Sequence, residues 1–194
     1  MQATLTQQLW PSQSDSSVRR SIVLMVLGSL FLALSAKVSI PFYPVPMTLQ
    51  TLAVLALGMA YGWRLGMATV ALYLAEGALG LPVFTGTPDK GLGLAYMLGG
   101  TGGYLLGFLP AVAIAGWLGE RGWDRSPWTT AAAMLMGNAA IYVPGLLWLG
   151  ALYGWDKPIL AWGFTPFWLG DVFKIALAMG LLPLVWRALN RTRR

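Results

Sequence analysis

Thr165-Pro-Phe-Trp-Leu-Gly-Asp-Val-Phe-Lys-Ile-Ala-Leu-Ala-Met-Gly-Leu-Leu-Pro-Leu-Val185 is an apolar run long enough to cross a bilayer, yet Asp171 and Lys174 lie within it. Insertion scales put an Asp or a Lys at mid-membrane at roughly 2.5–3.5 kcal/mol each. Helical spacing of i, i+3 places both side chains on one face, about 5–6 Å apart at Cβ, so each partly neutralises the other. Intramembrane ionisable residues indicate a functional site by default. The alternative is an ion pair that only locks helices together.

The composition is that of an integral membrane protein with one compact domain. Of 194 residues, 57% are hydrophobic and only 10% are charged, and the chain has no Cys and no His. Without these residues it lacks thiol catalysis, disulfides and the usual zinc, haem and iron–sulfur ligands, so we expect no metal and no cofactor. The net charge of +6 comes from residues at the edges of apolar segments, which favours a membrane surface over nucleic acid as the partner.

The apolar segments predict an all-α protein with six transmembrane helices. These fall near residues 21–40, 48–62, 65–80, 95–118, 129–153 and 166–188. The second and third are short and are joined by a turn at 62–64. We expect residues 1–20 to form a flexible cytoplasmic tail, residues 21–188 to form the substrate-binding domain, and residues 189–194 to form a basic cytoplasmic tail.

The basic residues between these helices are distributed unequally. With six spans, one side of the membrane carries nine of them and the other only Lys90 and Lys157. The nine are Arg19, Arg20, Arg64, Arg121, Arg125, Arg187, Arg191, Arg193 and Arg194. The positive-inside rule then predicts that both termini are cytoplasmic. We expect a multi-pass protein of the bacterial cell (inner) membrane.

Other polar residues within the spans extend the candidate site. Asn138 and Tyr142 share a helix face at i, i+4, and Glu76 lies near the outer end of the third helix. Together with Asp171 and Lys174, they predict a mostly apolar pocket for a small polar heterocycle that bears a carboxylate. Lys37, near the outer end of the first helix, can extend to the interface, and we assign it no role.

Small residues mark two helix surfaces. Gly99, Gly103 and Gly107 recur every four residues but lack the Gly-Lys-Ser/Thr ending of a nucleotide-binding loop. In a bilayer the same spacing predicts a smooth face that lets another helix approach closely. Ser29 and Ala33 form a second small pair, which serves either a partner membrane protein or a helix contact within the bundle.

Two external loops are apolar and rich in proline, whereas ordinary exposed loops are polar. They cover residues 41–46 and 80–93. Such loops are typical of lids over a site at the membrane face. The alternative is interfacial anchoring through Phe42, Tyr43 and Phe84.

Five ordered segments resemble the BioY family, the biotin-capturing S components of energy-coupling factor (ECF) vitamin transporters. They are Ile40-Pro-Phe-Tyr-Pro-Val-Pro-Met-Thr-Leu-Gln-Thr-Leu52, Leu72-Tyr-Leu-Ala-Glu-Gly-Ala-Leu-Gly-Leu-Pro-Val-Phe84, Gly99-Gly-Thr-Gly-Gly-Tyr-Leu-Leu-Gly-Phe108, Gly137-Asn-Ala-Ala-Ile-Tyr142 and Gly170-Asp-Val-Phe-Lys174. The resemblance covers roughly residues 20 to 187.

The resemblance implies six helices, high-affinity biotin uptake, and an external site closed by the first and third external-side loops. It also implies docking to a coupling membrane protein that carries two ATP-binding subunits, so the chain itself would be no enzyme. It implies that Asp171, Lys174 and Asn138 contact the ligand, and that Ser29 and Ala33 partly meet the docking pattern of S components. The further candidate ligand contacts are Tyr142, Glu76, Gln50, Phe84, Gly86 and Tyr96.

Other functions remain open at this point. The chain could be an S component for a different vitamin, or a facilitator that carries biotin without coupling proteins. An intramembrane enzyme would use Glu76 and Asp171 as acid and base, and a purely structural scaffold would bind nothing.

Overall fold

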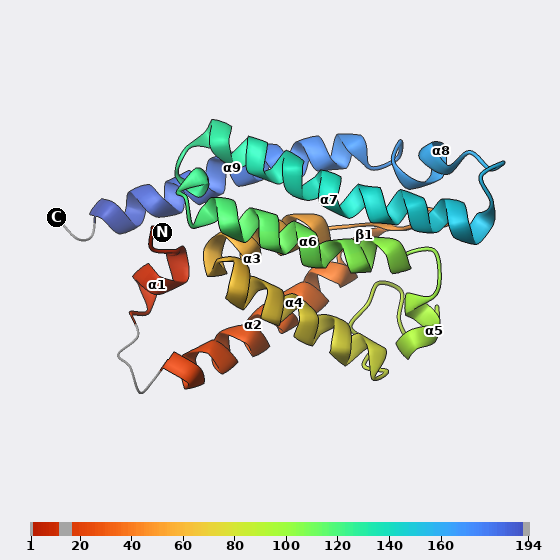
Figure 1. Ribbon diagram of the computed structural model, residues 1–194, viewed down its shortest axis with the longest axis horizontal. Helices are drawn as coiled ribbons and strands as arrows, with labels where there is room; N and C mark the ends of the chain where they lie inside the picture. The colour runs from red at the N-terminus through yellow and green to blue at the C-terminus, as the bar shows by residue number, and fades with distance from the viewer. Residues whose placement is uncertain (1, 12–16, 192–194) are drawn as a thin grey trace.

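The computed structural model describes residues 2–11 and 17–191 and is mostly helical (Figure 1). A helix lies in each of the six segments predicted from the sequence. These helices are α2 (Ser17–Lys37), α3 (Gln50–Tyr61), α4 (Trp63–Ala78), α6 (Gly102–Gly119), α7 (Pro127–Tyr153) and α9 (Trp168–Arg191). Short elements join them: α1 (Leu5–Leu9), β1 (Ser39–Ile40), β2 (Met47–Thr48), α5 (Gly93–Met97), the 3-10 turn η2 (Trp123–Arg125) and α8 (Ile159–Gly163).

Four parts of the described chain are long and apolar enough to cross a membrane. They are α2, α6, α7 and the stretch Ile159–Leu189, which contains α8 and most of α9. The helices α3 and α4 are shorter, with 12 and 16 residues. The described chain therefore has several helices able to cross a membrane, whereas the number of six crossings stays a prediction.

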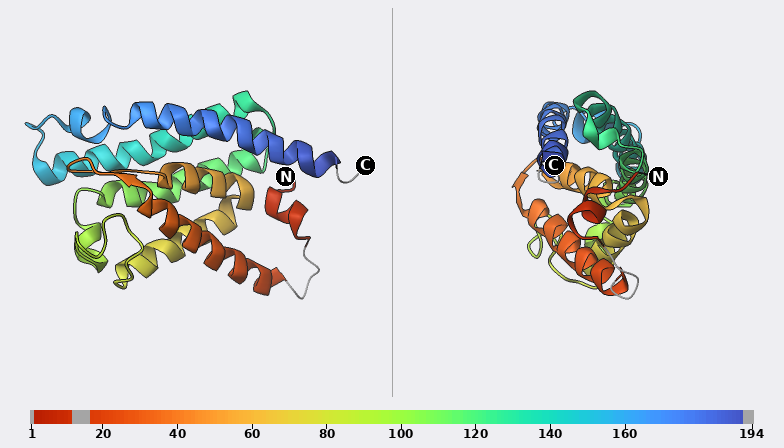
Figure 2. Two further views of the ribbon diagram at one scale, coloured as in Figure 1. Left: turned by 180° about the vertical axis from the view of Figure 1, so that it is seen from behind. Right: turned by 90° about the vertical axis from the view of Figure 1, so that its left-hand side faces the viewer.

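The helix α6 lies at the centre of the bundle and packs against α3, α4 and α7. On the outside, α2 packs against α4 and α3, and α9 packs against α7 and α3. The two ends of the bundle carry different short elements (Figure 2). The helix α1 and the end of α9 lie at one end, and the β1–β2 hairpin, α5 and α8 lie at the other.

The predicted glycine face is present where α6 meets α7. A Cβ atom on Gly103 would overlap Cβ of Trp148 and lie 2.5 Å from the carbonyl oxygen of Pro144. One on Gly107 would lie 2.9 Å from the carbonyl oxygen of Ile141. The two helices thus pack nearly backbone to backbone, which only glycine permits. Gly99 does not take part, because it lies in the turn before α6.

Gly103→Ala is expected to destabilise the protein by about 1–3 kcal/mol, because the new methyl group forces α6 and α7 apart. Gly180→Ala on α9 is the matched control, since a Cβ there meets nothing within 4 Å. Thermal unfolding in detergent should show a lower Tm for the first variant and an unchanged or higher Tm for the second. Equal Tm values for both variants would mean that α6 and α7 are not tightly packed at Gly103.

The structure departs from the prediction of one helix over residues 95–118. A turn at residues 98–101 separates α5 from α6, because the chain must bend around the external end of the bundle. The first external loop is also more regular than expected, since Ser39 pairs with Thr48 and Ile40 with Met47 in an antiparallel hairpin.

The prediction of a flexible tail over residues 1–20 is wrong for residues 2–11, which pack against the bundle. A capping box begins α1: the Gln7 amide N–H donates to the Thr4 hydroxyl, and the Thr4 N–H donates back to the Gln7 side chain. The Thr6 hydroxyl donates to the carbonyl of Ala60 at 3.1 Å, and Leu5 is buried. Residues 17–20 already belong to α2, and the tail residues 192–194 lie outside the described chain.

At the same end of the molecule, Asp124 of η2 is fully buried. Its Oδ2 accepts a hydrogen bond of 2.6 Å from the indole N–H of Trp186, and this bond ties η2 to α9. Burial raises the pKa of the Asp124 carboxyl above its ordinary value, against the opposing effect of the Trp186 bond. The guanidinium of Arg125 stacks over the Trp186 ring and donates to the carbonyl of Ala3. These contacts hold the N-terminal region to the bundle.

Candidate functional site

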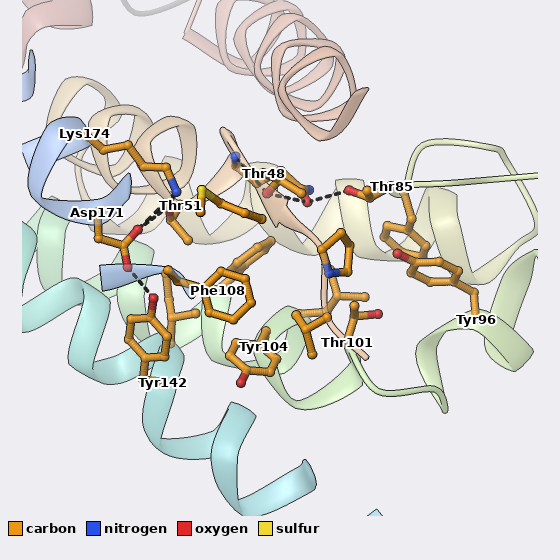
Figure 3. A pocket seen from close by; sticks show the side chains of 18 residues that line it. Thr48, Thr51, Thr85, Tyr96, Thr101, Tyr104, Phe108, Tyr142, Asp171 and Lys174 are labelled. Atoms are coloured by element: carbon orange, nitrogen blue, oxygen red, sulfur yellow. Dashed lines mark hydrogen bonds and ion pairs between the residues drawn. The ribbon is translucent and has the colours of Figure 1, made fainter. Parts of the chain in front are cut away.

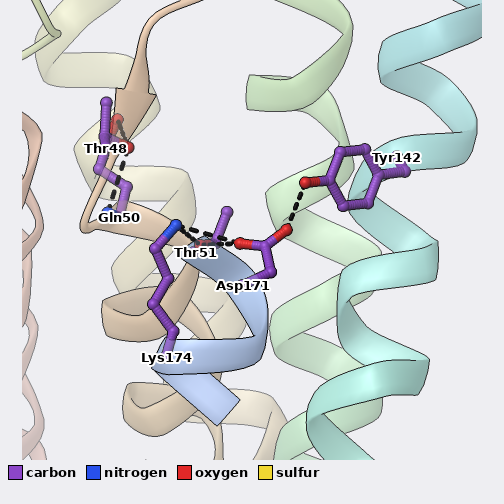
Figure 4. Close-up of polar contacts among 6 residues, drawn as sticks. All are labelled: Thr48, Gln50, Thr51, Tyr142, Asp171 and Lys174. Atoms are coloured by element: carbon purple, nitrogen blue, oxygen red, sulfur yellow. Dashed lines mark hydrogen bonds and ion pairs between the residues drawn. The ribbon is translucent and has the colours of Figure 1, made fainter. Parts of the chain in front are cut away.

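The two charged residues of α9 form a buried ion pair, as their spacing predicts. Lys174 Nζ lies 3.1 Å from Asp171 Oδ1, and both side chains are almost completely buried. Lys174 also donates to the hydroxyl of Thr51 on α3, at 2.9 Å. The hydroxyl of Tyr142 on α7 donates to the other oxygen, Asp171 Oδ2 (Figure 4). The carboxylate is therefore held by groups from three helices, which offsets much of the cost of burying its charge.

A second polar cluster surrounds the side chain of Gln50, at the start of α3. Gln50 Nε2 donates to the hydroxyl of Tyr73 at 2.6 Å, and that hydroxyl donates to the carbonyl of Val83. The hydroxyls of Thr48 and Thr85 each lie 3.4 Å from Gln50 Oε1 and donate to it. This cluster joins α3, α4 and the second external loop, so it fixes the loop over the end of the bundle.

Between the two clusters lies a cavity with mostly apolar walls (Figure 3). Its floor is formed by Tyr104 and Phe108 of α6, and the Tyr104 hydroxyl is held by the carbonyl of Gly163 at 2.9 Å. The free volume within this cavity is about 60 Å³. The residues that line it are Val45, Pro46, Met47, Thr48, Gln50, Thr51, Phe84, Thr85, Tyr96, Thr101, Tyr104, Leu105, Phe108, Ile141, Tyr142, Phe167, Asp171 and Lys174.

Two external loops cover this cavity. The hairpin supplies Val45, Pro46 and Met47, and the loop over residues 80–93 supplies Phe84 and Thr85. The lid prediction for these loops agrees with this placement. Most of this cover comes from the first and second of the predicted external-side loops, and the third supplies Phe167, in the turn before α9. The closure by the first and third loops that the resemblance implied stays a prediction.

Phe84 fixes the second loop through ring contacts. It stacks on Tyr96 of α5 with ring centroids 5.1 Å apart and meets Tyr73 of α4 edge-on at 5.4 Å. A Cβ on Gly77 would overlap the Phe84 ring, so the absence of a side chain there makes room for it. Burying the ring between three elements closes the loop onto the cavity.

Lys37, to which the sequence assigned no role, holds the same loop. Its Nζ, at the end of α2, donates to the carbonyl of Phe84 at 2.9 Å and to the carbonyl and hydroxyl of Thr87 at 3.2 and 3.1 Å. Hydrophobic patterning does not show such a contact, because it joins residues about fifty positions apart. Lys37 does not line the cavity, so it acts on the cover and not on a ligand.

Lys37→Met is expected to raise the dissociation rate of a bound ligand by about tenfold, with little change in the association rate, because the loop loses charge-assisted hydrogen bonds. Stopped-flow fluorescence of the purified protein measures both rates. Lys157→Met, in another external loop, is the control with the same charge change. Equal dissociation rates for Lys37→Met and the unchanged protein would remove Lys37 from loop closure.

Six of the predicted ligand contacts line the cavity, and three do not. The six are Asp171, Lys174, Tyr142, Gln50, Phe84 and Tyr96. Glu76 instead accepts a hydrogen bond from Ser29 between α4 and α2, away from Asp171. Gly86 lies in the covering loop with a positive φ of 72°, which favours glycine there.

Asn138 lies on the far side of Tyr142 and Asp171. It lines a separate apolar groove between α7 and α9, and its Oδ1 is buried with no partner among the described residues. Tyr142 and Asp171 line both the groove and the cavity, so they form the wall between them. The i, i+4 spacing placed Asn138 on the correct face of α7 but could not show that only Tyr142 reaches the cavity.

The cavity also uses residues that the sequence analysis missed, chiefly Thr51, Thr85, Thr101, Tyr104 and Phe108. Their types are common in any membrane helix, so no pattern singled them out. Thr51 is one residue from Gln50, and that proximity was the available signal.

Ser29, predicted with Ala33 as a docking pair, faces into the bundle in this fold. Ser29 is buried and bonded to Glu76, and Ala33 packs against the core. Ser29 thus makes a helix contact within the bundle, which was the alternative interpretation, and docking of a partner through Ala33 stays a prediction.

Comparisons with known proteins agree on one family. The family model described as "BioY family" matches residues 6–191. "Probable biotin transporter BioY" of Pyrococcus horikoshii is 40% identical over 156 residues, covering 79% of this chain and 90% of that protein. "Biotin transporter BioY2" of Lactococcus lactis is 34% identical over 178 residues, covering 90% and 94%. This chain is also similar to the crystal structure of "the S-component for biotin from an ECF-type ABC transporter", with a TM-score of 0.72 and 23% sequence identity. The match covers 91% of this chain and 95% of that one, so the two chains share a fold.

Proposed function

Because the chain belongs to the BioY family, we propose that it is the membrane subunit that captures biotin, with high affinity, for uptake into the cell. It works in transport and is not an enzyme. The observation that carries the proposal is the cavity itself, where a buried Asp171–Lys174 pair with Tyr142 and Thr51 lies among aromatic and aliphatic walls under two closing loops.

The cavity matches the chemistry of biotin. The ureido ring offers two N–H donors and one carbonyl acceptor, the thiophane ring and valeryl chain are apolar, and the carboxylate needs a donor. Asp171 can only accept while ionised, so it suits the ureido N–H groups, and Lys174 can donate to a ureido or carboxylate oxygen. The Tyr142 hydroxyl donates to Asp171 and keeps its lone pairs to accept from a ligand N–H. Phe84, Phe108 and Tyr104 supply apolar walls. Asn138 remains a candidate contact because its buried Oδ1 needs a donor.

We place the protein in the cell membrane with six crossings and both termini in the cytoplasm. The helices α3 and α4 span about 18 and 24 Å at 1.5 Å per residue, short for a hydrocarbon core of about 30 Å. Both ends of the described chain lie at one end of the bundle, as an even number of crossings requires (Figure 2). At that end, Arg64 lies in the first turn of α4, and Arg121 and Arg125 lie in the connection between α6 and α7.

The partners we propose are a coupling membrane protein and ATP-binding subunits. The sequence has no nucleotide-binding motif, so energy for uptake would come from other chains. The fold is that of a solved ECF S component. Biotin uptake by cells that contain this chain but no coupling proteins would instead support a solitary facilitator.

Biotin titration of the purified protein in detergent, followed by intrinsic tryptophan fluorescence, tests the function. We expect a saturable change at nanomolar biotin and none with riboflavin or thiamine. Saturable binding of one of those vitamins instead would assign the chain to a different substrate. No response to any vitamin, with calorimetry also silent, would reject the capture role.

A further inference from the structure

A lipid-facing groove lies at the proposed cytoplasmic end of the bundle, far from the biotin cavity. It is lined by Trp63 at the start of α4, by Ala113, Ile114 and Trp117 of α6, and by Met136 of α7. Trp117 and Met136 are 47% and 46% exposed, so the groove is open on the side that faces acyl chains. All five lining side chains are apolar apart from the two indole N–H groups, and such belts of tryptophan are typical of the membrane interface.

Two arginines lie at the rim of this groove. The guanidinium of Arg64 lies 5.1 Å from the ring centroid of Trp63, and that of Arg121 lies 3.2 Å from that of Trp117. The rings belong to touching helices, because a Cβ on Gly116 would overlap the amide nitrogen of Trp63. Each of the two cations therefore lies against a ring that lines the groove.

Neither arginine is neutralised by a carboxylate in the described part of the chain. No ion pair includes Arg64 or Arg121, and Arg121 makes one hydrogen bond to the carbonyl of Trp117. Glu120, at the end of α6, is the nearby acid. Its Oε1 accepts a hydrogen bond from the backbone N–H of Trp63, at the start of α4. Stacking on an indole leaves the edge of a guanidinium free, and this edge matches two phosphate oxygens. By contrast, Arg125 is engaged by Trp186 and Ala3.

We propose that this groove, formed by Trp63, Trp117 and Met136 under Arg64 and Arg121, is a binding site for an anionic phospholipid. One acyl chain fills the groove, and the phosphate lies between the two arginines. The choice of a lipid follows from two observations together: the floor is apolar and faces the bilayer, and the rim carries two unpaired positive charges that complement a phosphodiester. The site goes beyond biotin capture and rests on the proposed membrane placement.

Native mass spectrometry of the full-length protein tests this proposal. The protein is exchanged into detergent with equal amounts of phosphatidylglycerol and phosphatidylcholine of the same acyl composition. We expect preferential retention of phosphatidylglycerol by the unchanged protein. Arg64→Gln with Arg121→Gln should lower that preference by about tenfold or more. The charge-matched control is Arg19→Gln with Arg187→Gln, on α2 and α9, which should keep it.

A third variant tests the apolar part of the site. Ala113→Trp fills the groove while both arginines remain, and it should weaken retention of phosphatidylglycerol as well. Biotin binding by every variant shows that the protein is folded, since no altered residue lines the biotin cavity. Equal retention of both lipids by the unchanged protein, or a preference that survives the Arg64 and Arg121 replacements, would overturn the proposal. An equal loss of preference in the control pair would overturn it too, since binding would then reflect net charge alone.

Discussion

Asp171→Asn is expected to weaken biotin binding by roughly tenfold or more in protein that remains folded. The carboxylate accepts from Lys174 and Tyr142 and has capacity left for the ligand. An amide replaces one acceptor oxygen with an NH₂ group, which would face Lys174, Tyr142 or a ureido N–H with donor against donor. A lost hydrogen bond to a charged group costs about 1.5–3 kcal/mol, and tenfold in affinity corresponds to about 1.4 kcal/mol.

Calorimetric titration of the purified variant gives this change directly. Asp156→Asn is the control, because that carboxylate pairs with Lys157 in an exposed external loop and does not line the cavity. Unchanged affinity in folded Asp171→Asn would place biotin elsewhere in the bundle.

Lys174→Met is expected to cost about 3–5 kcal/mol in the free energy of unfolding, the largest stability effect we predict. Methionine keeps much of the length of the side chain but leaves the Asp171 carboxylate buried without a cation. Thermal unfolding in detergent should show the loss. Combining it with Asp171→Asn should recover most of the stability, because no charge is then buried, while biotin binding stays weak.

This pair of variants separates two roles of the ion pair. If the single and double variants unfolded at the same temperature, the Asp171 charge would carry no penalty, and the two residues would be independent. If the double variant bound biotin normally, the pair would serve only to lock α9 to α3.

Apolar run length predicted the positions of the long helices, because an apolar run in a bilayer has few alternatives to a helix. The i, i+3 spacing also predicted the contact between Asp171 and Lys174, since it depends on one helix alone. A flexible tail was predicted where Thr4 and Gln7 form a capping box, so this local pattern was missed.

Contacts between distant segments could not be predicted in this way. The bond from Lys37 to the loop at Thr87 and the contact of Thr51 with Lys174 depend on how helices pack. Ser29 shows the same limit, because a small residue on a helix serves an inner or an outer contact equally well, and only the position of Glu76 resolved it.

The glycine face of α6, formed by Gly103 and Gly107, restricts the motion of α6 relative to α7. At Gly103 and Gly107 the backbone of α6 is in direct contact with backbone and side-chain atoms of α7. No free space and no flexible side chain there would let one helix move relative to the other. The external loops are instead fastened by individual hydrogen bonds and one stacked ring. We therefore expect the site to open for ligand entry by local unfolding of the loops. Hydrogen exchange should be slow along α6 and α7 with or without biotin and should slow on binding only in the hairpin and in residues 80–93.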